Sequence, residues 1–81
     1  MKIYMRPVEM IAWFDFDKPR PIKFKLGDKV LKVEQVINFC EEKLAGNSMI
    51  VYRCQSEMNG KLKPFGLRFE LQTCKWFLFK I

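Results

Sequence analysis

The sequence predicts a mainly-β fold, namely a single domain over residues 1–81 with one curved antiparallel sheet of five to six strands. Two observations predict this class. Apolar and polar residues alternate with a period of two in several short runs, as in strands with one buried face. Turn-forming residues separate these runs at close intervals, and a chain of 81 residues makes one domain. The same pattern is compatible with a small SH3-like barrel.

The strongest local signal is the dipeptide Asn59-Gly60, which predicts a tight hairpin turn between residues 49–54 and 65–71. Both central residues of a type I′ turn have positive φ, which asparagine and glycine adopt most readily. A two-residue loop also fixes the register of the strands that it joins. Three apolar cross-strand pairs are therefore expected: Ile50 with Phe69, Tyr52 with Leu67, and Cys54 with Phe65.

A first strand is expected over residues 8–16. One face of this run carries Val8, Met10, Ala12, Phe14 and Phe16. Ile11 and Trp13 make the opposite face apolar as well, so both sides of the strand are candidates for burial. Pro19 and Pro21 remove two backbone donors, and we expect them to break the chain after this strand.

A second strand is expected over residues 22–26, followed by a turn at 27–29. Its alternation is regular, with Ile22, Phe24 and Leu26 facing inward and Lys23 and Lys25 facing outward.

Residues 30–47 support two interpretations. Residues 30–39 are rich in β-branched types, so we expect a strand with a bulge or bend there, and a loop or short helix near 40–47. A different pattern fits one face of a helix: Val33, Val36, Ile37, Cys40 and Leu44. A helix from about residue 34 to 45 would make the fold α+β, and the sequence leaves this alternative open.

The last run, residues 75–81, is apolar on both faces. Trp76 and Leu78 share one face, and Phe77 and Phe79 share the other. The length of the preceding turn decides which pair faces the core. A two- or four-residue turn aligns Trp76 with Leu71 and Leu78 with Phe69, whereas a three-residue turn aligns Phe77 with Phe69. One apolar pair therefore points away from the main core.

The residue types that carry most enzyme chemistry are absent or scattered. The chain has no histidine, which removes the usual acid–base group and every Ser-His-Asp or Cys-His pairing. Its four glycines stand singly, so no phosphate-binding loop is expected. Cys40, Cys54 and Cys74 lack C-x-x-C spacing, and we expect Cys54 to be buried and Cys74 to be exposed at a turn. We therefore expect no enzymatic activity, no cofactor and no metal site.

The sequence predicts neither a membrane span nor a signal peptide. No apolar run approaches the ~20 residues of a membrane span, and the N-terminus lacks the apolar segment of a signal peptide. A cytoplasmic location with reduced thiols and no membrane partner is therefore expected.

The surface is the remaining route to function. The formal net charge is +6, and outward positions of the predicted strands give a candidate interaction surface: Trp13, Lys23, Lys25, Lys32, Arg53, Arg68, Lys75, Phe77 and Phe79. Exposed aromatic residues and a free sheet edge favour a protein partner or a homo-oligomer. The alternative is a basic, aromatic sheet face that binds nucleic acid, with rings stacked on bases and cations at phosphates. We predict a small non-enzymatic binding module.

The second half of the chain resembles small bacterial proteins of similar length whose function is not known. The resemblance rests on residues 42–47, 52–56 and 73–76 and extends over about residues 6–81. It implies a bacterial, cytoplasmic, β-rich protein and brings no activity, ligand or catalytic residue. The segment Phe24-Lys25-Leu26-Gly27, leading into Val30, is also similar to hairpins of SH3-like small barrels.

Overall fold

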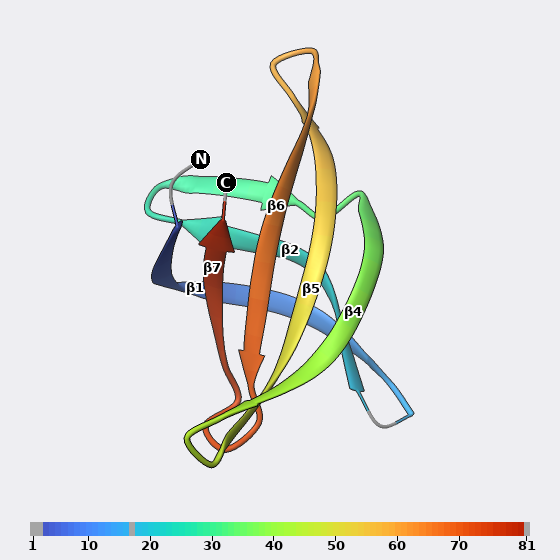
Figure 1. Cartoon of the computed structure of the whole chain (residues 1–81). Coiled ribbons are helices and arrows are strands. Elements are labelled where there is room, and N and C mark those ends of the chain that lie inside the picture. The colour runs from blue at the N-terminus through green and yellow to red at the C-terminus, as the bar shows by residue number, and fades with distance from the viewer. Residues whose placement is uncertain (1–2, 17, 81) are drawn as a thin grey trace.

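The computed structural model describes residues 3–16 and 18–80, whose ordered elements are seven strands. In chain order they are β1 (Ile3–Asp15), β2 (Lys18–Leu26), β3 (Lys29–Lys32), β4 (Gln35–Leu44), β5 (Asn47–Met58), β6 (Lys61–Glu70) and β7 (Lys75–Lys80). They form one antiparallel sheet in the order β3-β2-β1-β7-β6-β5-β4 (Figure 1). The mainly-β antiparallel sheet is thus confirmed, and the expected number of five to six strands is wrong.

The sheet curls into a half-barrel with two layers. Figure 1 shows β1, β2 and β3, here called the back layer, passing behind β4, β5, β6 and β7, the front layer, at a steep angle. β1 joins the layers because its first half pairs with β7 and its second half pairs with β2. The edge strands of the described sheet are β3 and β4, so the sheet is open and is not a closed barrel.

The core lies between the two layers. Most of its buried side chains come from inward positions of the front layer, and the cluster consists of Phe24, Ile50, Tyr52, Cys54, Phe65, Leu67, Phe69, Trp76 and Leu78. Partly buried residues of the back layer, among them Met10, Ala12 and Leu31, pack against this cluster. Burial of apolar surface between the layers is the main force that holds the curl.

The Asn59-Gly60 hairpin forms as predicted. Both residues have positive φ, 53° and 77°, as a type I′ turn requires. The register is also confirmed, with three pairs that face the core: Ile50 with Phe69, Tyr52 with Leu67, and Cys54 with Phe65. Local turn chemistry therefore determines the pairing of the two strands that supply most of the core.

Residues 40–47 are neither a loop nor a helix. β4 continues to Leu44, and Ala45 and Gly46, at φ 51° and 80°, turn the chain tightly into β5. The described residues contain no helix, so the α+β alternative is wrong. The turn allows residues 38–44 to pair with β5 along their length, and this pairing outweighs a weak local helix preference.

The seventh strand comes from residues 30–39, for which the sequence predicts one strand. They divide between β3 and β4, and residues 33–34 join the two. The predicted bulge is confirmed in β4, where the register with β5 skips Ile37.

The prolines lie inside a strand, contrary to expectation. β2 begins at Lys18, and Pro19 and Pro21 are buried within it. The register with β1 then skips Ile22, which marks a bulge. The bulge changes the alternation, so Ile22 is 39% exposed instead of facing the core.

The last strand presents Trp76 and Leu78 to the core, as an even-numbered turn predicts. The turn spans residues 71–74, and the Cys74 amide donates to the Glu70 carbonyl at 2.8 Å. The expected pairs are displaced by two residues, because Trp76 lies opposite Phe69 and Leu78 lies opposite Leu67. An early end of β6 at Glu70 accounts for this shift.

Within residues 3–16 and 18–80, no helix of the length and apolarity needed to cross a membrane is found.

We expect Gly60→Val to lower the free energy of unfolding by about 1–2 kcal/mol, because a β-branched residue is strained in left-handed backbone. A Cβ at Gly60 meets no atom within 4 Å, so the loss reports backbone strain and not a clash. Urea unfolding followed by tryptophan fluorescence measures it. Gly60→Asn is the matched control and should lose clearly less, because asparagine tolerates positive φ. Equal losses in the two variants would contradict the role assigned to this turn.

Candidate functional site

The structure divides the predicted interaction surface between two faces. The outward side of the back layer, here the back face, carries Trp13, Lys23, Lys25 and Lys32. The outward side of the front layer, here the front face, carries Arg53, Arg68, Lys75, Phe77 and Phe79. The nine residues therefore do not form one surface. The curl of the sheet between β1 and β7 separates them, and the alternation of residues along each strand could not reveal that curl.

On the front face, Arg68 is already engaged. Its guanidinium lies 3.8 Å from the centre of the Phe79 ring and forms an ion pair with Glu42 at 3.5 Å. The Arg68 side chain is only 16% exposed, and its buried Nε has no hydrogen-bond partner among the described residues. A hollow of about 420 Å³ lies beside it, with Arg53 and Cys40 in its lining.

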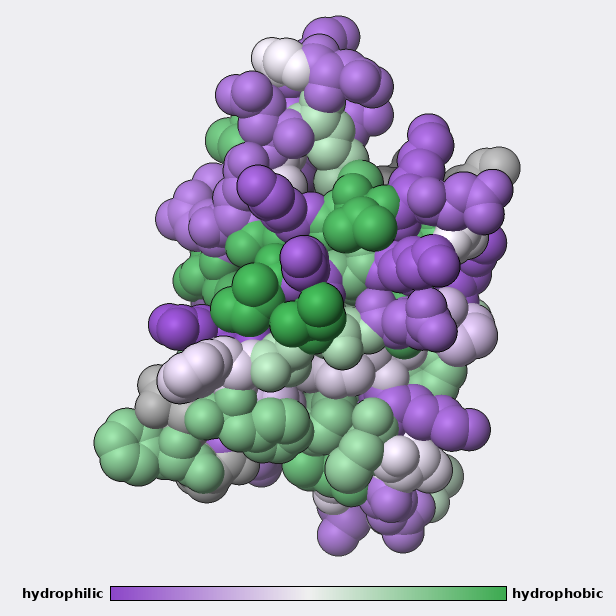
Figure 2. All heavy atoms as spheres, turned by 180° about the vertical axis from the view of Figure 1, so that it is seen from behind, coloured by the Kyte–Doolittle hydropathy of each residue, from purple (hydrophilic) through white to green (hydrophobic). Residues whose placement is uncertain are grey.

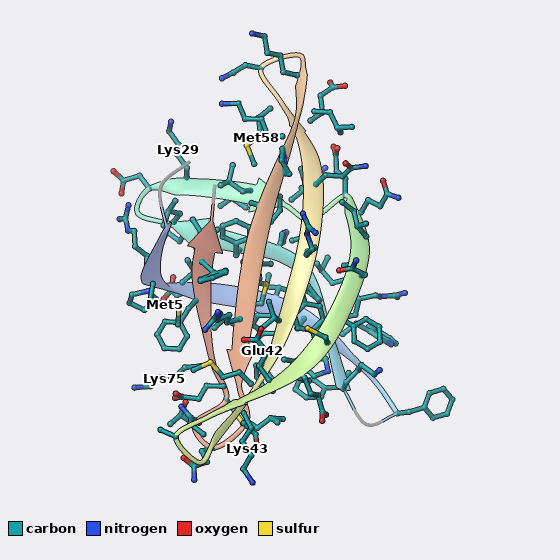
Figure 3. All side chains as sticks on the ribbon, viewed as in Figure 1. Met5, Lys29, Glu42, Lys43, Met58 and Lys75 are labelled. Carbon is teal, nitrogen blue, oxygen red and sulfur yellow. The ribbon has the colours of Figure 1, made fainter. Side chains whose placement is uncertain are left out.

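Lys75 contributes little to this hollow. It projects from the edge of the molecule at the start of β7, away from Glu42 (Figure 3). The front face thus presents a neutralised arginine, and Arg53 is its exposed cation within the hollow.

A third feature, which the sequence did not indicate, is a groove at the gap between the two layers of the curled sheet. This seam groove, of about 430 Å³, lies between the tip of the β1–β2 hairpin and β4, and it is lined by Phe16, Lys18, Pro19, Ile37, Phe39 and Tyr52, among others. Phe14 and Phe16, which the alternation made candidates for burial, are 64% and 100% exposed near the hairpin tip. Ile37 and Phe39 on β4 are about half exposed, at 49% and 48%.

Side chains bridge the bottom of the seam groove. The Tyr52 hydroxyl donates to the Pro19 carbonyl, which ties β5 to β2 beneath β4. The Lys18 ammonium lies 3.7 Å from the centre of the Phe39 ring, a cation–π contact between the two walls. The groove therefore has an apolar floor and a cation at its rim.

The β3–β4 connection holds one end of the seam. The Ser56 hydroxyl donates to the Lys32 carbonyl at 2.5 Å and accepts from the Glu34 amide at 3.0 Å. The Val33 amide donates to the Ile22 carbonyl at 2.8 Å. These bonds satisfy backbone groups where the chain crosses from the back layer to the front layer.

β4 leaves one set of backbone groups without a strand neighbour among the described residues. In a two-residue hairpin the residues that flank the turn exchange both hydrogen bonds, so Leu44, Glu42 and Cys40 direct their backbone groups toward β5. Phe39, Glu41 and Lys43 then direct theirs to the free edge. This edge is available to another strand.

The facing part of β2 cannot serve the same purpose. The Pro19 carbonyl points into the seam, where it accepts from Tyr52, and residues two apart in a strand point the same way. Pro19 and Pro21 therefore occupy positions whose N–H groups would face the seam, and proline has none. The two prolines could have indicated this edge from the sequence, because proline inside a strand is confined to sheet edges and bulges.

No metal-binding cluster of three or more His, Cys, Asp or Glu side chains occurs in the part of the chain that the structure describes. Cys54 is buried and Cys74 is exposed, as predicted, and Cys40 is exposed as well. Comparison with protein-family models, curated proteins and solved structures finds no significant match to this chain. The bacterial origin and cytoplasmic location implied by resemblance therefore stay predictions.

The backbone directions predict alternating hydrogen exchange along β4. The amides of Phe39, Glu41 and Lys43 should exchange rapidly, because they face the free edge, and those of Cys40 and Glu42 should exchange slowly. Exchange followed residue by residue by NMR measures this. Uniform protection along β4, or the opposite alternation, would show that the free edge is assigned to the wrong residues.

Two buried groups predict a loss of stability at alkaline pH. Burial, together with the neighbouring Cys54, raises the pKa of the Tyr52 phenol from 10.0 to about 12, and burial raises the pKa of the Cys54 thiol from 9.0 to about 12. The folded state favours both neutral forms, so the stability they confer is complete below pH 9 and is lost as pH rises toward 12.

Denaturant titrations across this pH range should therefore show a falling free energy of unfolding. A Tyr52→Phe, Cys54→Ala double variant should show a weaker pH dependence, although its stability at neutral pH is lower. An unchanged slope in the double variant would contradict the assignment to these two groups.

Proposed function

We propose that this chain is a non-enzymatic protein-interaction module that binds an extended segment of another protein at the free edge of β4. The observation that carries the proposal is the position of the seam groove directly beside that edge. A strand added to β4 gains main-chain hydrogen bonds, and the groove beside it receives alternate side chains.

The exposure of apolar groups supports a partner at this place. Phe16 is fully exposed, and Ile37 and Phe39 are about half exposed around one groove. Burial of apolar surface is worth roughly 25 cal/mol per Å². A partner that covers these three side chains would therefore gain binding free energy from the apolar surface that it buries. Clustered exposed apolar groups with a polar rim are typical of interaction sites.

The chemistry of the rim indicates the kind of segment that fits. Lys18 and Arg20 line the groove on the β2 side, and both are cations. The half-exposed Phe39 and the fully exposed Phe16 add apolar surface at the groove. A fitting segment is extended, with apolar side chains toward the groove and a carboxylate placed to meet Lys18 or Arg20.

Pairing of β4 with a second copy of itself is less favourable. A two-fold axis at Glu41 places two Glu41 side chains opposite each other, and an axis at Glu42 does the same for Glu42. Like charges directly opposite destabilise a strand pair. The net charge of +6 adds repulsion between copies. The proposal therefore favours a different protein as the partner.

A proline at Glu41 tests the edge directly. The Glu41 amide faces the free edge, so Glu41→Pro removes a donor for the partner and breaks no bond to β5. Peptides selected on the immobilised protein from a random displayed library, and then synthesised, serve as probes. Glu41→Pro should weaken their binding about tenfold, the worth of one main-chain hydrogen bond. Glu41→Ala keeps the donor and is the matched control.

The comparison of Glu41→Pro with Glu41→Ala distinguishes three outcomes. Binding that Glu41→Pro weakens and Glu41→Ala preserves, together with new protection of the Phe39, Glu41 and Lys43 amides, supports the proposal. Selected peptides that bind both variants equally, or a failure to select any peptide, would overturn it. A concentration-dependent dimer that Glu41→Pro abolishes would replace the foreign partner with a second copy of this chain.

A further inference from the structure

The back face lies on the other layer from the seam groove and has a chemistry of its own. Cross-strand register sets its outward positions in rows: Ile11, Lys23 and Lys32 in one row, Glu9, Lys25 and Val30 in the next, and Trp13 beside Arg20. Four of these residues are cations and one is an acid. Of these residues only Arg20 also lines the seam groove used by the proposed strand addition at β4.

The lysines of the back face form no ion pair among the described residues, although Glu9 lies opposite Lys25 in the register. Lys23 and Lys32 lie directly opposite each other on β2 and β3. Among the described residues, no carboxylate comes within ion-pair distance of either lysine or of Lys25. Like charges directly opposite each other destabilise a sheet. A bound anion between these lysines would remove that cost.

Apolar side chains occupy the same rows. Ile11, Trp13 and Val30 are 57%, 63% and 60% exposed. Figure 2 shows this side of the molecule, with the most hydrophobic side chains at the centre, moderately hydrophobic ones below them, and hydrophilic side chains mainly above and to the right. A ligand that covers the face must therefore offer both negative charge and apolar, flat surface.

We propose that the back face binds single-stranded nucleic acid. The indole of Trp13 offers a stacking surface for a base, and Arg20 lies beside it on the neighbouring strand, where its planar guanidinium also stacks. Lys23, Lys25 and Lys32 meet the phosphates. Charge complementarity selects a polyanion over a second copy of this chain, because two such faces would repel each other.

A change in tryptophan fluorescence on ligand binding reports mainly on the back face. Trp13 is 63% exposed and Trp76 is 7% exposed, so a ligand stacked on the back face quenches Trp13. The probes are an oligothymidylate and an oligouridylate. Three phosphate contacts predict a salt slope of about 2, so affinity should fall roughly 20-fold between about 50 and 200 mM salt.

Variants with equal charge change locate the site. Lys23→Gln with Lys32→Gln should weaken binding and reduce the salt slope to about 0.7, because two phosphate contacts are lost. Lys61→Gln with Lys63→Gln removes the same charge from exposed residues of β6 and should leave the affinity and the slope nearly unchanged. Trp13→Leu should abolish the quenching.

Three results would overturn the proposal. The first is no fluorescence response to either oligonucleotide at about 50 mM salt, where phosphate contacts are strongest. The second is an equal loss of affinity in both lysine pairs. The third is a blue shift of Trp13 emission on vesicles of anionic phospholipid with no response to oligonucleotides, which would assign the face to a membrane surface. Glu41→Pro should not alter oligonucleotide binding, so this test is independent of the seam groove.

Discussion

The register between β5 and β6 is the constraint on which the rest of the molecule depends. Asn59 and Gly60 hold left-handed backbone, and the ten-residue ladder that follows places Tyr52, Cys54 and Leu67 toward the core. A slip of one residue would turn all of these side chains outward. The same register places Arg68 and Arg53 on the front face. Core and surface are therefore two consequences of one turn.

The two strands that border the seam differ in how they handle unpaired backbone. β2 carries prolines at the two positions that face the gap, and Tyr52 satisfies the Pro19 carbonyl from the opposite layer. β3 is only four residues long and has lysines at both ends, features that discourage edge-to-edge pairing. β4 has ten residues and no proline. The β2 side of the seam is therefore protected against pairing with another strand, and the β4 side is not.

The parts of the fold that depend on local chemistry were predictable from sequence, and the parts that depend on curvature were not. Asn59-Gly60 has an unmistakable turn preference. Ala45 has no such turn preference, because alanine seldom adopts a positive φ such as the observed 51°. The residues of the β4–β5 turn were therefore compatible with the end of a helix. The alternation of residues in the last strand predicts which of Trp76 and Phe77 faces the core, provided that the preceding turn is known to have an even number of residues. Nothing in the alternation specifies that β1 pairs with β7, and that pairing creates both the seam groove and the separation of the two faces.

The pairing of β1 with β7 also bears on how the chain folds. Every other ladder in the sheet joins strands that are adjacent in sequence, so each can close as a local hairpin. The β1–β7 ladder joins residues near opposite ends of the chain, such as Val8 and Trp76, and must close a long loop. We therefore expect two small meanders, β1–β3 and β4–β7, to form first, each with one apolar face open to water. Docking along β1 and β7 buries both faces in one late step. Without β7 the first half of β1 has no strand partner, so we expect a chain cut before β7 to leave both apolar faces open and to aggregate more readily.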